Sequence, residues 1–164
     1  MKITKDDFNW LYSQATGFMR TQILAVAASL RLAEHLRSGG HTSEEFASAS
    51  GIEPSMALRF LRACTKIGLI TCDDGRTFKS TSRLQALHGE TPNSMRNKAM
   101  VLGTRAQYLI WSEFLAAVRT NQAQAAGALG ASMFDYYADH PDEAAIFRAT
   151  PLDNGYVVIE TAAA

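Results

Sequence analysis

The sequence predicts a mainly α-helical protein: a winged helix-turn-helix with a small β-hairpin and additional N- and C-terminal helices. Three observations lead to this fold class. Apolar residues recur at helical spacing over most of the chain, two helices flank a tight turn, and an Asp-Gly turn between two short β-prone segments follows them. With 164 residues, 47% of them hydrophobic, the chain can bury a core as one domain with an arm.

The N-terminal segment is predicted to form helices over residues 6–16 and 18–37, with a break near Gly17. The second helix carries one apolar stripe at spacings of three and four residues: Met19, Ile23, Val26, Leu30 and Ala33. A second apolar row lies beside it: Ala25, Ala28, Leu32 and Leu36. Because this arc is wider than a single seam, we expect a second subunit to cover part of it. In the alternative, the helix is fully buried within its own monomer.

Small residues of this helix would allow the second subunit to approach closely: Ala25, Ala27, Ala28 and Ser29. We therefore assign the dimer interface to one row, namely Met19, Ile23, Val26 and Leu30.

The central segment has the element order of a winged helix. Gly39-Gly40 ends the second helix, and Thr42 with Glu45 supplies a capping box for the next one. The elements expected after it are a helix through Ser50, a turn at 51–54, a helix from Ser55 to Gly68, a strand at 69–72, a turn at 73–75 and a strand at 77–80.

The C-terminal half is predicted to be helical up to about residue 150. The expected helices run from Ser94 to Leu102, through Tyr108, Trp111, Phe114, Leu115 and Val118, from Met133 to Ala138, and from Pro141 through Phe147. Residues 121–130 read as a connection, and 156–159 as a lone strand at most. We divide the chain into 1–90 with the winged helix, 91–150 as a helical extension, and a tail at 151–164.

Composition excludes several classes of protein and site. No apolar run approaches the roughly 18 residues of a membrane span, and no apolar segment follows the N-terminus as in a signal peptide, so we expect a cytoplasmic protein that does not enter membranes. Cys64 and Cys72 are predicted to be reduced packing thiols. The four histidines lack the spacing of a metal-binding helix, and we assign no metal site.

A winged helix also suggests a DNA-binding transcription regulator. Arg59, Arg62 and Lys66 lie at i, i+3 and i+7 on one face of the third helix, where they could approach phosphates. Residues 41–90, however, carry six bases and six acids, so the net charge of the module is zero. Because phosphate neutralisation supplies most non-specific DNA affinity, nucleic acid is the less favoured partner.

Several ordered segments carry a resemblance to a known family. They are Gly40 to Ala47, Gly51 to Pro54, Leu58 to Ile70, Phe78 to Thr81, Trp111 to Thr120, and Met133 to Phe147. This set resembles the N-terminal dimerisation domain of S-adenosylmethionine-dependent small-molecule O-methyltransferases, which is itself a winged helix. The resemblance covers roughly residues 10 to 150. It implies an intertwined homodimer of a methyltransferase-like protein of secondary metabolism, whose later helices cap a catalytic domain.

The resemblance also implies a substrate-binding set. In such proteins the segments similar to Tyr108 to Phe114 and Met133 to Phe147 line the acceptor pocket, and residues near Phe18 and Met19 reach the pocket of the partner. We therefore assign the following residues to substrate binding: Phe18, Met19, Tyr108, Trp111, Met133, Phe134 and Phe147. Polar candidates near them are Tyr108, Glu113, Asp135, Tyr136, Tyr137 and His140. Plain core packing is the alternative for each apolar member of this set.

The sequence departs from the family in one respect. No Asp-x-Gly-x-Gly loop follows a strand, so we expect no cofactor to bind this chain, and S-adenosylmethionine only if a separate catalytic domain supplies its site. No catalytic residue is assigned. The predicted function is a dimerisation and substrate-capping domain, with a small molecule as its ligand. The alternative is a methyltransferase-derived protein that binds or converts a natural-product intermediate without the cofactor.

Overall fold

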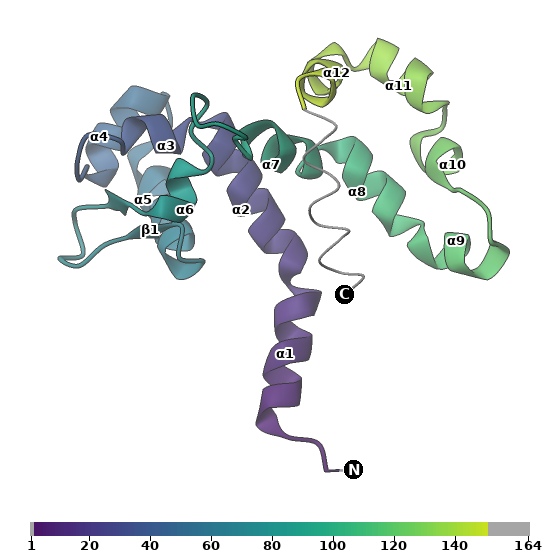
Figure 1. Ribbon diagram of the computed structural model, residues 1–164, viewed down its shortest axis with the longest axis horizontal. Coiled ribbons are helices and arrows are strands. Elements are labelled where there is room, and N and C mark those ends of the chain that lie inside the picture. Colours follow the sequence, from purple (N-terminus) through teal and green to yellow (C-terminus); the bar gives the residue numbers. More distant parts are fainter. Residues whose placement is uncertain (1, 151–164) are drawn as a thin grey trace. The chain divides into compact units, whose positions relative to one another are not determined.

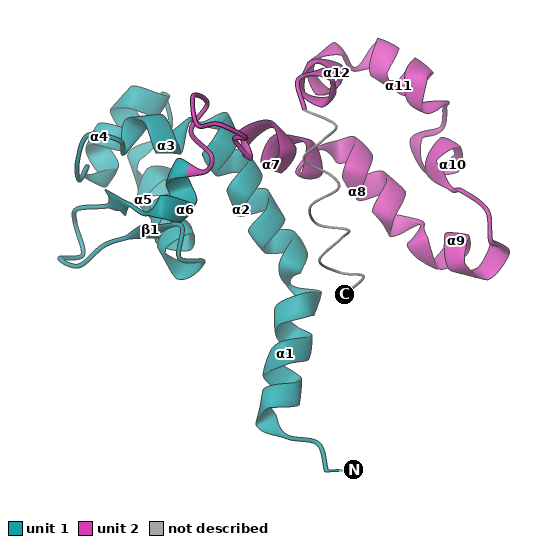
Figure 2. Ribbon diagram, in the orientation of Figure 1, with its two compact units in different colours: residues 1–85 teal, residues 86–164 magenta. Residues whose placement is uncertain are grey.

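The computed structural model describes residues 2–150 and is mainly helical, with one two-stranded antiparallel sheet in that range (Figure 1). The predicted fold class is confirmed at this level. The chain divides between Gln85 and Ala86 into two compact units, five residues before our predicted division at 90 and 91 (Figure 2). The predicted tail and its strand at 156–159 lie outside the described residues.

The first unit begins with three helices: α1 (Lys5–Ala15), α2 (Gly17–Ser29) and α3 (Leu32–His35). Thr4 and Asp7 form a capping box at the start of α1. The break near Gly17 is present, but the single helix predicted over 18–37 is wrong. Arg31 takes a left-handed backbone with φ 53°, which ends one helix before the next begins, and its guanidinium pairs with Glu34 at 3.7 Å.

The winged-helix order follows in the same unit. Its elements are α4 (Ser43–Ser50), α5 (Pro54–Lys66), β1 (Ile70–Thr71), β2 (Lys79–Ser80) and α6 (Ser82–Gln85). The capping box of Thr42 and Glu45 is present. The strands pair Ile70 with Ser80 and are shorter than predicted, and a β-bridge joins His41 to Phe78 beside them. Helix α6 was not predicted.

The core of this unit uses one of the two predicted apolar rows. Ala25, Ala28, Leu32 and Leu36 are all buried. The largest fully buried side chains of the unit are Phe46, Phe78, Leu32, Leu36, Leu61, Ile70 and Leu84. Ala25, Ala27 and Ala28 are covered within this chain, so the prediction that they face a second subunit is wrong. Their small size instead permits close packing inside the chain.

The second unit contains α7 (Arg96–Leu102), α8 (Arg105–Ser112), α9 (Phe114–Thr120), α10 (Ala125–Leu129), α11 (Met133–Asp139) and α12 (Pro141–Arg148). The helix predicted through Val118 is interrupted at Glu113 and ends before Asn121, which takes a left-handed backbone with φ 53°. The predicted connection at 121–130 contains α10. Ser132 caps α11 as its sequence suggested, accepting from the Asp135 N–H at 3.2 Å.

The close approach of Gly40 to the wing gives a first prediction. A Cβ at Gly40 would clash with Cγ2 of Thr77 beside the His41–Phe78 bridge. Gly40→Ala should therefore lower the free energy of unfolding by about 1–3 kcal/mol. Thr77→Ser removes that methyl group and should restore most of the loss in the double variant. Urea unfolding of the four proteins measures this, with Gly127→Ala, where nothing lies within 4 Å, as the control; additive losses would contradict the packing.

The two cysteines give a second prediction. Cys64 is buried, which raises the pKa of its thiol to about 12, whereas Cys72 is half-buried. At pH 8 the Cys64 thiol stays protonated and shielded, and thiolate is the reactive form. We expect one thiol per native chain to react with a disulfide reagent and both to react in denaturant. Cys72→Ser should abolish the reaction of the native protein. Rapid labelling of the native Cys72→Ser variant would show that the reagent reaches Cys64, which would contradict its burial in α5.

Candidate functional site

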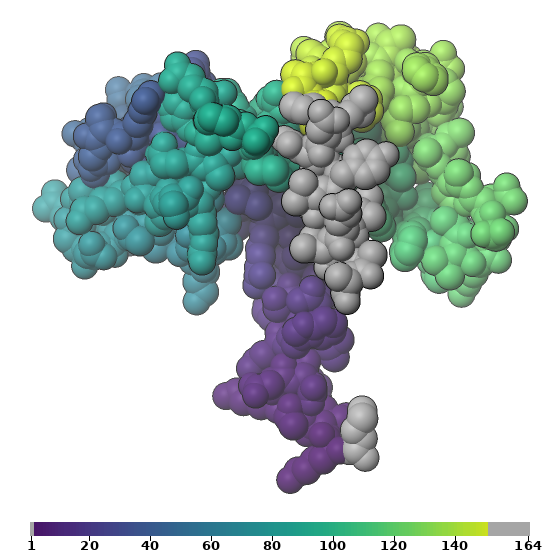
Figure 3. All heavy atoms as spheres, viewed as in Figure 1, coloured from purple at the N-terminus to yellow at the C-terminus, as the bar shows by residue number. Residues whose placement is uncertain are grey.

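An apolar surface covers α1 and the start of α2. Its large side chains, which we call the α1 surface, are each at least half exposed: Ile3, Phe8, Trp10, Leu11, Tyr12, Phe18 and Met19. Tyr12 is 73% exposed, and α1 has no buried residue. In Figure 3 this helix, in purple, stands with its side chains uncovered on the visible face. Soluble monomers rarely expose contiguous apolar surface of this kind.

The predicted dimer row continues this surface along α2. Met19 and Val26 are 53% and 40% exposed, whereas Ile23 and Leu30 are half-buried. Ala33, the last member of the stripe, is buried. The structure therefore separates the two predicted rows of α2, one in the core and one partly open.

A second apolar surface lies on α8 and α9. Tyr108 and Trp111 of α8 are 40% and 65% exposed, and Phe114, Leu115 and Val118 of α9 are also open. The rings of Trp111 and Phe114 meet with their centroids 5.5 Å apart. The interruption at Glu113 thus leaves the apolar residues of both helices exposed together.

The remaining predicted substrate residues lie on α11 and α12. Phe134 is 89% exposed, Met133 is half-buried, and Phe147 stacks on Tyr137 at 5.0 Å between ring centroids. No ring contact joins Trp111, Phe134 and Phe147 to one another. A shared pocket of these three residues therefore stays a prediction.

A polar network connects three helices of the second unit. The Glu143 carboxylate of α12 accepts from the Ala106 N–H of α8 at 3.2 Å and from the Tyr136 hydroxyl of α11 at 3.4 Å. His140 stacks on Tyr136 at 4.0 Å and donates from Nδ1 to its carbonyl at 2.8 Å. Burial and the Glu143 charge raise the pKa of Tyr136. Tyr136 and His140 were predicted as polar candidates, whereas Glu143 was noticed only as an acid in a first helical turn.

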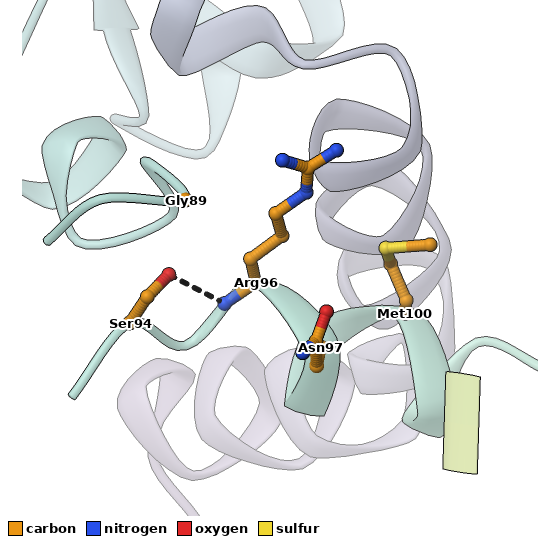
Figure 4. A pocket seen from close by; sticks show the side chains of 5 residues that line it. All are labelled: Gly89, Ser94, Arg96, Asn97 and Met100. Atoms are coloured by element: carbon orange, nitrogen blue, oxygen red, sulfur yellow. Dashed lines mark hydrogen bonds between the residues drawn. The ribbon is translucent and has the colours of Figure 1, made fainter. Parts of the chain in front are cut away.

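A cavity of about 300 Å³ lies at α7, and none of the predicted site residues lines it. It is lined by Gly89, Ser94, Arg96, Asn97 and Met100 (Figure 4). Ser94 Oγ accepts from the Arg96 N–H at 3.2 Å, and Asn97 Nδ2 donates to the Ala149 carbonyl at 2.6 Å. Its polar groups thus already make hydrogen bonds within the protein. Sequence reasoning missed this cavity because its lining residues show no motif.

The face that would contact DNA carries exposed cations, but the wing has no excess of positive charge, because Asp73 and Asp74 balance Arg76 and Lys79. Arg59, Arg62 and Lys66 are exposed on α5. In the wing, Lys79 Nζ pairs with Asp73 at 3.3 Å. Asp74 accepts from the N–H groups of Arg76 and Thr77, which holds the pKa of its carboxyl far below its usual range. A wing of zero net charge adds little to phosphate binding.

The described residues contain neither a metal-binding cluster nor a long apolar helix. No group of three or more His, Cys, Asp or Glu residues in this part of the chain could hold a metal ion. No helix within residues 2–150 has the length and apolar character needed to cross a bilayer.

Comparison with known proteins places this geometry in a family context. The O-methyltransferase dimerisation domain matches residues 12–89. The chain is 33% identical to phenazine O-methyltransferase PhzM of Lysobacter antibioticus over 138 residues, which are 84% of this chain and 40% of that protein. It is 30% identical to acetylserotonin O-methyltransferase of Rattus norvegicus over 146 residues, 88% of this chain and 32% of that protein.

A solved structure agrees with these matches. The crystal structure of LaPhzM superimposes with a TM-score of 0.75 at 32% identity, over 85% of this chain and 42% of that one. The chain therefore spans less than half the length of the relatives that it matches.

Proposed function

Residues 12–89 form an O-methyltransferase dimerisation domain, the N-terminal part of S-adenosylmethionine-dependent small-molecule methyltransferases, and we propose from this that two copies of the chain associate through the α1 surface. We propose further that the helices of the second unit contact the methyl acceptor. This corresponds to a division of the chain into dimerising residues 1–90 and substrate-capping residues 91–150.

The observation that carries the dimer is the state of α1. This helix has 11 residues, none of them buried, and isolated helices of that length are marginal in water. Phe8, Trp10 and Tyr12 expose apolar area on more than one side of the helix, which water penalises. A second copy presenting the same surface supplies the missing cover, since a two-fold interface is self-complementary.

The row on α2 extends this interface. Met19 and Val26 of α2 are exposed, and Ile23 and Leu30 are half-buried. Because the other row of the same helix is already buried in the core, α2 joins the core of the first unit to the proposed interface. The buried row and the exposed row together form the wide apolar arc predicted for this helix.

The acceptor surface is supported by the exposed aromatic residues of the second unit. Trp111, Phe134 and Phe147 are 65%, 89% and 43% exposed, and exposed aromatic rings offer stacking area for a flat molecule. The relatives are named for a phenazine and for acetylserotonin, both of which contain fused aromatic rings. We therefore propose a planar aromatic small molecule as the acceptor, contacted by Tyr108, Trp111, Met133, Phe134 and Phe147, with Phe18 and Met19 facing the acceptor of the partner.

The described residues do not fit S-adenosylmethionine. Nucleoside cofactors of this kind are held by a glycine-rich loop between a parallel strand and a helix. Between residues 2 and 150 the strands are the antiparallel pair Ile70–Thr71 and Lys79–Ser80, and the turn after β1 leads to β2 instead of a helix. We place cofactor binding and methyl transfer outside this range, in a catalytic domain.

The dimer is tested by placing a charge in the α1 surface. Leu11→Asp should raise the dimer dissociation constant by about a hundredfold or more, because an unpaired buried charge costs about 3–5 kcal/mol. Val26→Asp should act in the same direction through α2. Light scattering of the parent should give twice the 17.9 kDa of one chain.

Asn9→Asp is the matched control for the dimer, because it adds the same charge to an exposed polar position of α1 and should leave the dimer intact. A parent that is monomeric at high concentration would reject the proposed interface. So would a Leu11→Asp protein that remains as dimeric as the control.

The acceptor surface is tested by equilibrium dialysis with phenazine and with N-acetylserotonin. We expect the full chain to bind at least one of them, and Trp111→Ala to weaken binding about tenfold, since stacking on an aromatic ring contributes about 0.5–1.5 kcal/mol beyond area burial. Met56→Ala removes a similarly exposed apolar side chain from α5 and should have no effect. Equal binding by both variants would contradict the assignment.

A further inference from the structure

Glu143 occupies a position that the proposed function does not use. It lies in the first turn of α12, and its two carboxylate oxygens accept hydrogen bonds from two other helices. Oε2 accepts from the Ala106 N–H of α8 at 3.2 Å, and Oε1 accepts from the Tyr136 hydroxyl of α11 at 3.4 Å. One side chain thereby connects α8, α11 and α12.

The bond to Ala106 replaces a local helix cap. The first N–H groups of a helix have no partner within it, and the side chain just before the helix usually accepts from one of them. Thr104 holds that place in α8, but its hydroxyl donates to the Val101 carbonyl at 2.8 Å and makes no cap. Ala106 is fully buried, so its N–H depends on Glu143, 37 residues further along the chain.

The partner on α11 is equally enclosed. Tyr136 is 5% exposed. Its ring stacks on His140 at 4.0 Å between centroids and meets the Tyr137 ring edge-on at 5.8 Å. Tyr137 in turn stacks on Phe147. The contacts of the Glu143 carboxylate therefore continue through aromatic rings to a side chain of the proposed acceptor surface.

The opposite end of α12 is held as well. The Ala149 carbonyl, which follows the last residue of α12, accepts from Asn97 Nδ2 of α7 at 2.6 Å. Along the chain, Phe147 lies between Glu143 and the bonded Ala149 carbonyl. Both ends of α12 are thus bonded to other helices of the second unit.

We propose that Glu143 is a positioning residue: by capping α8 and holding Tyr136, it fixes the side chains that α8, α11 and α12 present to the acceptor. This inference rests on the proposed function for the identity of the acceptor surface. The residue itself contacts no acceptor in this assignment. It acts through Trp111 on α8, Phe134 on α11 and Phe147 on its own helix.

The experiment compares Glu143→Ala with Glu143→Gln in the full chain. Alanine leaves the buried Ala106 N–H and the Tyr136 hydroxyl without an acceptor. Glutamine keeps an oxygen for Ala106 and an NH₂ group that can donate to the Tyr136 oxygen, so it should rescue the geometry without the charge. Asp142→Ala is the matched control, because it removes an exposed acid from the same first turn of α12.

Two measurements need no ligand. Hydrogen exchange of the Ala106 amide should accelerate about tenfold or more in Glu143→Ala, the loss expected for a hydrogen bond to a charged group. The NMR signals of the Trp111 indole and the Phe147 ring should shift in the same variant and return in Glu143→Gln. Tyr136→Phe removes one of the two bonds and should give a smaller shift, which keeps the test open if the alanine variant does not fold.

The third measurement is phenazine binding by dialysis. We expect Glu143→Ala to bind about tenfold more weakly, with Glu143→Gln and Asp142→Ala close to the parent. Unchanged Ala106 exchange and unchanged Trp111 and Phe147 signals in Glu143→Ala would overturn the positioning role. A parent that binds neither phenazine nor N-acetylserotonin would overturn the proposed acceptor, and the two ligand-free measurements would still decide on Glu143.

Discussion

The apolar area of α1 is the constraint on which the other features of the first unit depend. A short amphipathic helix without a covering surface loses more in conformational entropy and hydration than its own hydrogen bonds return. The capping box of Thr4 and Asp7 organises the first turn, but it buries none of the aromatic rings. One side of α2 packs into the core of the first unit and the other side does not. This accounts for the buried row and the exposed row of α2, and for the need of a second surface to cover α1.

The wing of the first unit shows how a fold can keep the order of a nucleic-acid reader without its electrostatics. Asp73 pairs with Lys79, and Asp74 organises the turn by accepting two backbone N–H groups. These acids stabilise the hairpin at its tip, where a DNA-binding wing would carry cations. The exposed cations of α5 belong to a module, residues 41–90, whose net charge is zero, which favours solvation over phosphate binding.

Local signals in the sequence predicted the elements best. The capping box of Thr42, the cap at Ser132 and the Asp-Gly turn each identify a boundary through chemistry within four residues. The helix end at Arg31 was missed because arginine seldom adopts a left-handed backbone, and nothing in its neighbourhood signals it. The end of α9 at Asn121, in contrast, coincides with the start of the predicted connection at residue 121. Glu143 has the signature of a favourable helix-dipole charge, and only the folded chain places it at Ala106. The exposed aromatic residues were visible in the sequence, whereas their ring partners were not.

The distance in sequence between Glu143 and Ala106 also governs the order in which the second unit can form. Helix α8 lacks a cap from its own neighbourhood, so its first turn remains incomplete until α12 has been synthesised and has docked. For contacts of such long sequence separation, the entropy of loop closure is lost before the contacts contribute any stability. Folding of this unit is therefore expected to be cooperative and late, with the fraying end of α8 as the last part to become protected.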